Sequence, residues 1–410
     1  MKEERTHMRK ICIITSMIYP IPAVKGGAVE GLVELLVRVN EKYKKLDLTV
    51  VSLYDSGAEK ESRKYKNTKF VYIKKKKWDE ILSKKIFIYA NKVVMKFLGK
   101  TIIDMPYIKA AMHVLKDEEF DIYVLEGGGD CYNFGYMHKI IEPDKLYVHF
   151  HGEVAGDKAI AMWFGKYITV SNYIARRLIC NGAVDSRKVV VLPNCYDEDS
   201  MAVKYPREQI RERYGLASSD FVYIYWGRLL PQKGVYEMLE AFRLLVSETM
   251  DSTINLRLII VGNASFGYGT YSAYDQKLRK LCEDKIIKDK IIFTGFLPHD
   301  EIGSILSSCD VGVIPSIWDD PAPLTIFEGM SKGLPLIAGN VGGIPEVIKD
   351  GNNGILVRWS PDYVMDLCTA MKCLRDSKEL RMRFSNNARE TVKEYNQDRY
   401  YNQFVEIVNA

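Results

Sequence analysis

The 410-residue sequence lacks several features that would assign it to a membrane, secreted or metal-binding class. It has no apolar run near the roughly 18 residues that a spanning helix needs, and it opens with no signal-peptide pattern. Its eight cysteines form no Cys-x-x-Cys pair and most lie in apolar runs, which predicts buried free thiols in a reducing cytoplasm. The six histidines supply only one close pair, His149 and His151, which is few for a metal cluster.

What the chain does have is apolar material arranged in short runs. Hydrophobic residues make up 47% of the sequence, enough for the cores of two or three domains. Strand-length runs alternate with helical patterns such as 28–42, and a helical pattern over 380–409 ends the chain. The polar segment 193–206 lacks a period and is the predicted linker. The predicted strands are 11–16, 48–53, one near Val71, 122–125, 146–150, 167–170, 189–192, 221–226, 256–261, 290–293, 311–314, 334–337 and 354–357.

This alternation predicts an α/β protein in which each half forms a parallel sheet covered by helices on both faces. Such sheets bind ligands at the carboxyl ends of their strands. The stretch after the 311–314 strand carries two carboxylates, Asp320 and Glu328. Pro323 suits the first position of the following helix, which leaves the amides of Leu324 and Thr325 free for an anion. An anion site beside two carboxylates indicates a ligand with phosphates and hydroxyls, such as a sugar nucleotide.

The same stretch resembles the retaining glycosyltransferases of family 4, which have the two-domain GT-B fold. Their hallmark is two glutamates separated by seven residues in a Pro-Ser … Glu … Glu-Ala-Met setting. Here Pro315-Ser316 precedes Asp320, and seven residues separate Asp320 from Glu328-Gly329-Met330. The first acid is an aspartate, so its side chain is one methylene shorter. The resemblance implies that Glu328 binds ribose hydroxyls and that Asp320 contacts the sugar.

The resemblance also implies a domain layout. It places an acceptor-binding Rossmann-like domain at 8–197, completed by a crossover helix at about 390–410. A nucleotide-sugar-binding Rossmann-like domain is expected at 198–389, facing the first across a cleft. Family members need no metal, so we expect no cofactor beyond the nucleotide-sugar substrate.

Two glycine- and cation-containing loops extend the resemblance. Gly26-Gly27 lies between the first strand and first helix, and paired glycines let backbone approach a phosphate. By resemblance Gly27 is a donor-phosphate residue. Arg228 and Lys233 follow the 221–226 strand five residues apart, which lets both reach one diphosphate. They match the Gly-Arg … Lys-Gly signature, whose inferred task is to stabilise the departing diphosphate.

Two further segments match the family near the donor. His149 and His151 share one strand face by the period of two. The resemblance makes His151 a contact of the transferred sugar at the interdomain cleft and leaves His149 in strand packing. Phe296 and Leu297 follow the 290–293 strand in the turn whose backbone meets the nucleotide base. The candidate catalytic residues are therefore His151, Asp320, Arg228 and Lys233.

These expectations describe a cytoplasmic retaining hexosyltransferase. Its donor would be UDP- or GDP-linked and its acceptor a glycan or lipid-linked molecule, in bacterial surface polysaccharide or glycoconjugate synthesis. One alternative is a sugar phosphorylase or synthase on the same fold. The other is a non-catalytic sugar-nucleotide-binding scaffold, in which Asp320 marks lost activity.

Charge is concentrated in one segment of the first half. Residues 63–100 contain thirteen Lys and Arg against two acids, a net of +11, whereas the whole chain carries +5. Between Trp78 and Lys100, apolar residues recur at helical spacing beside a lysine face that includes Lys85, Lys92 and Lys96. Such a helix can lie on an anionic membrane at the inner face of the cell. The alternative is an ordinary amphipathic helix with a solvated face. Nucleic acid is not an expected partner, because no binding motif accompanies the charge.

Overall fold

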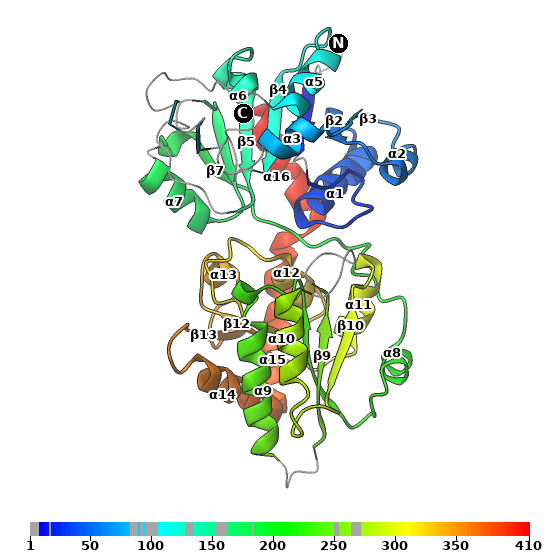
Figure 1. Ribbon diagram of the computed structural model, residues 1–410, viewed down its shortest axis with the longest axis vertical. Coiled ribbons are helices and arrows are strands. Elements are labelled where there is room, and N and C mark those ends of the chain that lie inside the picture. Colours follow the sequence, from blue (N-terminus) through cyan, green and yellow to red (C-terminus); the bar gives the residue numbers. More distant parts are fainter. Residues whose placement is uncertain are drawn as a thin grey trace, which may run out of the picture. The chain divides into compact units, whose positions relative to one another are not determined.

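The chain folds into two compact units in the computed structural model (Figure 1). The first unit comprises residues 1–193 and 397–410, and the second comprises residues 194–396. Both units alternate strands with helices along the chain. The described residues are 8–15, 18–82, 89–90, 93–94, 105–127, 135–152, 163–182, 184–249, 254–263 and 272–410.

A parallel sheet forms the centre of the first unit. Its strands are β1 (Lys10–Ile14), β2 (Asp47–Leu53), β3 (Thr68–Ile73), β4 (Ile122–Gly127), β5 (Leu146–Phe150), β6 (Lys166–Thr169) and β7 (Val189–Val191). Within the described residues their order is β3-β2-β1-β4-β5-β6-β7. The strand order reverses between β1 and β4, which is the switch point where open α/β sheets bind ligands.

The second unit repeats this topology. Its strands are β8 (Phe221–Trp226), β9 (Leu256–Val261), β10 (Ile291–Gly295), β11 (Val311–Ile314), β12 (Leu336–Gly339) and β13 (Gly354–Val357). In the part of the chain that the structure describes, they run parallel in the order β10-β9-β8-β11-β12-β13. The switch point therefore lies between β8 and β11. The residues after these two strands are brought to one edge of the sheet.

Helices connect the strands in both units. The first unit contains α1 (Ala28–Tyr43), α2 (Ser56–Ser62), α3 (Lys77–Leu82), α5 (Pro106–Val114), α6 (Gly135–His138), α7 (Asn172–Gly182), α16 (Gln397–Asn409) and the short 3₁₀ helices Pro143–Lys145 and Ser186–Lys188. The second contains α8 (Arg207–Arg213), α9 (Val235–Ser247), α10 (Ala273–Leu281), α11 (His299–Ser307), α12 (Leu324–Ser331), α13 (Ile344–Val347), α14 (Tyr363–Asp376), α15 (Lys378–Val392) and the 3₁₀ helices Pro231–Lys233 and Lys393–Tyr395.

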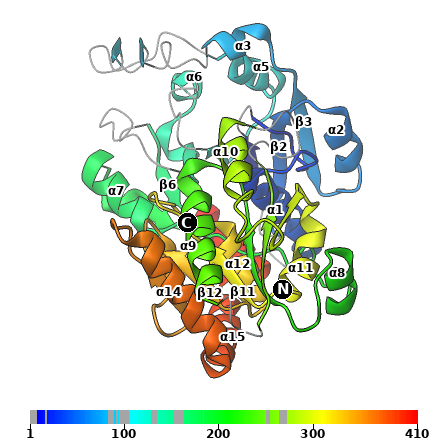
Figure 2. The same ribbon diagram turned by 60° about the horizontal axis from the view of Figure 1, so that its bottom comes forward.

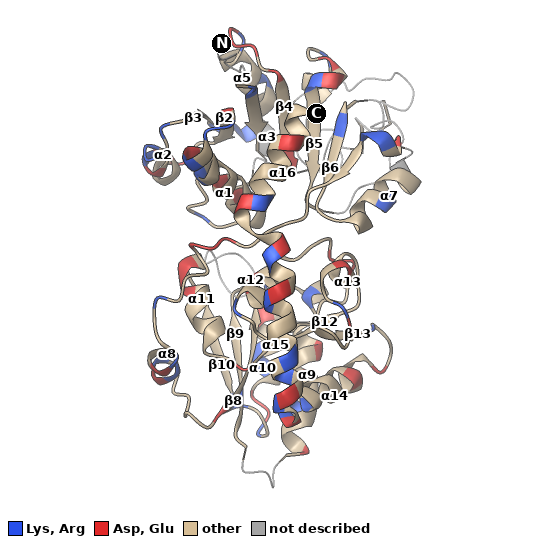
Figure 3. Cartoon of the chain, turned by 180° about the vertical axis from the view of Figure 1, so that it is seen from behind, with Lys and Arg blue, Asp and Glu red and all other residues tan. Residues whose placement is uncertain are grey.

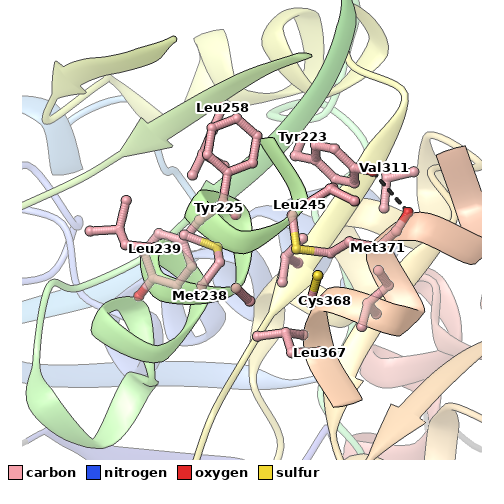
Figure 4. Packing of buried hydrophobic residues seen from close by; sticks show 14 of the residues in the cluster. Tyr223, Tyr225, Met238, Leu239, Leu245, Leu258, Val311, Leu367, Cys368 and Met371 are labelled. Atoms are coloured by element: carbon pink, nitrogen blue, oxygen red, sulfur yellow. Dashed lines mark hydrogen bonds between the residues drawn. The ribbon is translucent and has the colours of Figure 1, made fainter. Parts of the chain in front are cut away.

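Strand periodicity divides the core of the second unit into two layers. Tyr223 and Tyr225 of β8 pack with α9, α10 and α14 on one face, where the Tyr223 hydroxyl donates to Met371 O at 2.8 Å (Figure 4). Figure 2 shows α9 beside α14 on this side. Ile224 and Trp226 point to the other face, with α11, α12 and α15. Because both faces are covered, β8 is apolar at every position.

The C-terminal helix α16 completes the first unit by packing on α1. The Tyr401 hydroxyl donates to Asn40 Oδ1 at 2.6 Å, and both side chains are fully buried. The backbone amide of Leu46 also donates to Asn40 Oδ1, and Asn40 Nδ2 donates to Leu46 O. Arg9 donates to Val408 O at 2.7 Å. A buried polar network of this kind stays stable because its members are satisfied.

The predicted α/β class with two Rossmann-like domains is confirmed. Five strands match the sequence prediction residue for residue: 146–150, 221–226, 256–261, 311–314 and 354–357. The predicted strand 334–337 is displaced to Leu336–Gly339, because Pro335 has no N–H to donate to a neighbouring strand. The helical pattern predicted over 380–409 corresponds to two α-helices, α15 and α16, with a 3₁₀ helix between them. Asn396 is extended and donates its side chain to Lys393 O, which separates α15 from α16.

Hydrogen bonds of the residues after Pro193 explain where the first unit ends. The first unit ends at Pro193, ahead of the domain limit predicted at 197. Asn194 Nδ2 donates to Ala322 O at 2.8 Å, and Tyr196 N donates to Tyr395 O at 3.2 Å. These bonds fix the segment after Pro193 to the second unit, and the chain returns to the first unit at Gln397.

Most of the described cysteines are buried or partly buried, as the sequence predicted. Of the described cysteines, Cys180 and Cys373 are exposed, because they lie on the outer faces of α7 and α14. The expectation of a buried thiol was wrong for these two. Cys12, Cys195, Cys309 and Cys368 are buried and Cys282 is partly buried.

Among the described residues, no helix combines the length and the apolarity that crossing a bilayer requires.

Candidate functional site

Lys233 and Asp320 meet at the switch point of the second sheet. Lys233 ends the 3₁₀ helix that follows β8, and Asp320 lies in the loop that follows β11. Lys233 Nζ is 2.5 Å from Asp320 Oδ2, and the two side chains are only 18% and 5% exposed. Ser316 Oγ donates to the same carboxylate oxygen at 3.2 Å. The sequence predicted both residues for one site, and the structure joins them as an ion pair in which Asp320 is buried and Lys233 is partly buried.

Close backbone approach holds the two loops together. Gly234, directly after Lys233, has a φ of +69°, and a Cβ at this position would lie 1.8 Å from Pro315 O. Ile317 N donates to Gln232 O at 3.1 Å, which links the same loops. The Asp320 carbonyl accepts from Gly343 N at 2.8 Å. The ion pair is therefore positioned by backbone packing at the ends of the strands.

Arg228 lies two residues after β8. Its side chain is exposed, and its carbonyl accepts a 2.7 Å hydrogen bond from the hydroxyl of buried Tyr225. Gly227 before it has a φ of +146°. A Cβ on Gly262, at the end of β9, would lie 2.1 Å from Gly227 O. These glycines let the loop that carries Arg228 lie against the neighbouring strand end.

Glu328 lies on α12 and has a separate pair of partners. Trp226 Nε1 donates to Glu328 Oε2 at 2.8 Å, and His299 Nε2 lies 2.9 Å from Glu328 Oε1. The Glu328 side chain is 8% exposed. Desolvation lowers the pKa of His299, but the hydrogen bond and charge of Glu328 outweigh it, so the net shift is upward. The structure thus orients both oxygens of Glu328, and it gives Glu328 and Asp320 different partners.

Trp226 and His299 were missed by the sequence reasoning. Trp226 ends β8 on the face that points toward α12, so its position relative to Glu328 follows from the strand period and the sheet order. His299 begins α11, immediately beyond the predicted base-contacting turn. No spacing within the sequence links either residue to Glu328. Each lies far from Glu328 in the sequence and comes close to it only in the folded protein.

The first turn of α12 differs slightly from the expectation. Pro323 is the N-cap, and the helix begins at Leu324, so the prediction of Pro323 as the first helical residue was wrong by one position. Its extended backbone (φ −67°, ψ 128°) explains the difference. Leu324 and Thr325 are the first two helical residues, whose amides lack carbonyl partners within a helix. They retain the capacity for an anion that the sequence indicated.

Phe296 and Leu297 follow β10 on the far side of the switch point from β11. Gly295 has a φ of +72° and accepts from Gly262 N at 2.8 Å, which turns the chain out of the sheet. Phe296 is 43% exposed, whereas Leu297 packs partly against the core. An exposed aromatic ring at a strand end is available to a ligand.

The remaining predicted residues belong to the first unit. Gly27 is the N-cap of α1 with a φ of +110°, and a Cβ there would lie 2.1 Å from Glu30 Oε2. His151 follows β5, and its Nε2 lies 2.6 Å from Glu126 Oε2. His149, expected only in strand packing, also reaches this carboxylate, at 3.1 Å. Glu126 at the end of β4 was not singled out from the sequence.

Comparison with known proteins shows what the region that holds this site is similar to. Residues 206–391, which include the Lys233–Asp320 pair and Glu328, match the model of the glycosyl transferases group 1. Most of the second unit is therefore similar to this family.

Similarity to individual proteins extends beyond residues 206–391. It is 26% identical to the putative glycosyltransferase YtcC of Bacillus subtilis, over 94% of this chain and 88% of YtcC. It is 28% identical to the UDP-Gal:alpha-D-GlcNAc-diphosphoundecaprenol alpha-1,3-galactosyltransferase of Escherichia coli, over 52% of each chain. The structure of HepE from Anabaena in complex with UDP is similar with a TM-score of 0.73 at 16% identity, covering 98% of this chain and 100% of HepE. The expected GT-B fold is confirmed.

Proposed function

We propose that this protein is a metal-independent retaining glycosyltransferase that transfers a sugar from a UDP-linked donor to a glycan or lipid-linked acceptor. The observation that carries the proposal is the buried Lys233–Asp320 pair at the switch point of a group 1 glycosyl transferase domain. The structural relative HepE is described with UDP and with UDP-glucose, which favours UDP over GDP as the donor nucleotide.

The donor roles follow from the chemistry of each group. Lys233 has three N–H donors, so it can keep Asp320 as one partner and still donate to a phosphate oxygen. Arg228 and the amides of Leu324 and Thr325 supply further donors for the diphosphate. Together they stabilise the negative charge that grows on the departing UDP. Stabilisation of this kind by preorganised donors is usually the largest single term in catalysis.

Further residues bind the rest of the donor. Glu328 accepts from the ribose hydroxyls, and Asp320 accepts from a sugar hydroxyl with its remaining lone pairs. Phe296 and Leu297 meet the uracil base. From the resemblance, Gly27 is proposed for the donor phosphate and His151 for the transferred sugar. Retention of configuration follows if the acceptor attacks from the face that the diphosphate leaves.

The acceptor and the site of action are proposed from the surface of the first unit. Lys74, Lys75, Lys76 and Lys77 are exposed, and the adjacent Trp78 is 63% exposed. Elsewhere in the described part, Lys and Arg are interspersed with Asp and Glu (Figure 3). Lysines beside an exposed tryptophan suit an anionic membrane surface. Peripheral binding at the inner face of the cell membrane, in surface polysaccharide synthesis, would bring the enzyme to a lipid-linked acceptor. Lys85, Lys92 and Lys96 of the predicted helix lie outside the described residues.

A donor screen with the full-length protein tests the proposal. A nucleotide at about 100 times its dissociation constant should raise stability by about 2.7 kcal/mol, and we expect UDP to do so more than GDP at equal concentration. The matching UDP-sugar should be consumed in the presence of a metal chelator, with the anomeric configuration kept in the product. A requirement for inorganic phosphate would indicate a phosphorylase instead, and nucleotide binding without turnover on any donor would indicate a scaffold.

A further inference from the structure

Three side chains of the first unit form a buried cluster beside its switch point. Glu126 of β4 lies opposite His149 of β5 in the parallel register, and His151 lies two residues further on the same face. The exposed fractions of these side chains are 3%, 1% and 8%. The two imidazole rings lie 4.0 Å apart between centroids. Both imidazoles direct a nitrogen at the Glu126 carboxylate, His151 Nε2 at 2.6 Å and His149 Nδ1 at 3.1 Å.

The protons of this cluster can be assigned from its electrostatics. Burial alone would raise the pKa of Glu126, but the charges and hydrogen bonds of His149 and His151 outweigh it and lower the pKa to about 2. Glu126 is therefore a carboxylate and can only accept. Burial, followed by the charge of His149, lowers the pKa of His151, against the opposing effects of Glu126 and of Glu30 on α1. His151 is thus neutral near pH 7, with its single proton on Nε2.

We propose that Glu126 is a positioning residue that holds His151 as the Nε2–H tautomer, so that His151 Nδ1 accepts a hydrogen bond from a hydroxyl of the transferred sugar. The inference rests on the proposed function, in which His151 contacts that sugar. A neutral imidazole backed by a carboxylate places negative potential toward the sugar. A protonated ring would instead repel the positive charge that develops on the sugar as the diphosphate leaves.

The same three residues have the composition of a metal site, and their ligand atoms lie within 4.8 Å of one another. Two observations favour the hydrogen-bonded cluster. A separation of 2.6 Å between His151 Nε2 and Glu126 Oε2 is that of a charge-assisted hydrogen bond, and His149 Nδ1 hydrogen-bonds to Oε1 of the same carboxylate at 3.4 Å. His149 Nε2 is buried and has no hydrogen-bond partner among the described residues, whereas a metal-ligating histidine usually donates its second N–H.

The first measurement is the tautomer itself. In the full-length protein with ¹⁵N-labelled histidine, the His151 resonances are identified by their loss in His151→Gln. Long-range proton–nitrogen correlations should show the proton on Nε2 in the unmodified protein. In Glu126→Gln, which keeps the side-chain size and removes the charge, a share of His151 should move to the Nδ1–H form. A proton on Nδ1 in the unmodified protein would overturn the proposal without reference to any variant or to activity.

The second measurement is transfer. Glu126→Gln should lower kcat about 100-fold, the effect of a misplaced reacting partner, while its dissociation constant for UDP stays unchanged because His151 is proposed to contact the transferred sugar and not the nucleotide. Glu118→Gln is the matched control, since Glu118 pairs with Lys69 on the surface of the same unit, and it should change neither quantity. Unchanged kcat and tautomer in Glu126→Gln would overturn the proposal.

A zinc titration separates the metal alternative. Stoichiometric binding of Zn²⁺ by the unmodified protein, lost in Glu126→Gln and accompanied by higher activity, would also overturn the proposal. If the proposed function itself were wrong, these experiments would give a different result. The unmodified protein would then transfer no sugar from any donor, while the tautomer of His151 would still report on the role of Glu126.

Discussion

At the scale of single residues, the site depends on charges that are buried in pairs. Asp320 is 4% exposed and has Lys233 as its cationic partner at 2.5 Å. Removing one member of a buried pair leaves the other without compensation, which costs about 3–5 kcal/mol. Lys233 is therefore expected to contribute to folding as well as to the proposed diphosphate binding, and removing both charges separates the two contributions.

We expect Lys233→Met to lower the free energy of unfolding by about 3–5 kcal/mol and to reduce transfer by about 10²–10³-fold. The double variant Lys233→Met/Asp320→Asn should recover most of the stability and none of the transfer, because the buried charge is gone but the diphosphate contact is not restored. Denaturant unfolding and initial rates measure the two effects. Exposed Lys288 provides the control, since Lys288→Met should change neither. Recovery of transfer in the double variant would contradict the role of Lys233 at the diphosphate.

The His299–Glu328 pair makes donor binding depend on pH. Desolvation lowers the pKa of His299, but Glu328, with further contributions from Asp197 and Asp300, outweighs it and raises the pKa, and His299 Nε2 lies against one carboxylate oxygen of Glu328. Ribose hydroxyls that displace His299 release its proton, so affinity for UDP should rise as pH increases through this raised pKa. The stability that the pair contributes changes in the opposite sense and is lost over the same rise in pH.

Calorimetry from pH 6 to 8 measures this dependence. His299→Gln should flatten it, and comparing the two proteins at each pH cancels the titration of UDP itself. Glu328→Gln should weaken binding by about 1.5–3 kcal/mol throughout, because an ionised acceptor is lost. An identical pH profile in His299→Gln and the unmodified protein would show that ribose does not compete with His299.

The sequence predicted those site residues whose spacing lies within one continuous segment. Asp320 and Glu328 lie on one loop and helix, so their separation was readable from the chain. The partners that orient them come from other elements. Trp226 reaches Glu328 across 102 positions, and Glu126 reaches His151 across 25. Such pairs are set by sheet order and register, which a single sequence does not specify.

At the scale of secondary-structure elements, parallel strands were the most predictable part. A strand covered on both faces is apolar throughout, and β8 stands out as an uninterrupted run, whereas Arg257 is the one charged residue in β9. Element ends were less predictable. Pro323 capped its helix one residue outside the predicted position, and the tail was divided at Asn396, because caps depend on one residue's backbone rather than on a period.

Gly234 lies at the end of a 3₁₀ helix, directly after the candidate catalytic residue Lys233. We expect Gly234→Ala to destabilise the protein by more than the cost of the left-handed conformation, about 1–2 kcal/mol, because its Cβ would overlap Pro315 O. Gly215→Ala is a matched control. Gly215 has a similar φ of +62° but open space around its Cβ, so it isolates the conformational cost.

Thermal unfolding and transfer rates distinguish the two variants. Gly234→Ala should also slow transfer, since the loop must move away from β11 and carry Lys233 with it. Gly215→Ala should retain full transfer. Equal stability losses in the two variants would mean that the close approach to Pro315 is relieved without strain.

At the scale of the whole molecule, α16 makes the first unit discontinuous in sequence. Tyr400, Tyr401, Phe404, Ile407 and Val408 are buried within that unit. A chain ending at residue 396 should therefore lose amide protection in the first unit while the second keeps it, as hydrogen exchange would show. Tyr401→Phe is the milder test. It removes the donor to buried Asn40 and should cost about 1–3 kcal/mol. Protection lost equally in both units would contradict the division.

The same discontinuity determines when each unit can complete its folding during synthesis. The first unit has nearly all of its sheet by residue 193, but its closing helix is synthesised last, after the roughly 200 residues of the second unit. At about 5–20 residues per second, the ribosome takes about 10–40 s over that interval. During this time the apolar face of α1 that α16 later covers is exposed in the cell. The second unit, which is continuous, can finish folding first, so the order of maturation is the reverse of the order of synthesis.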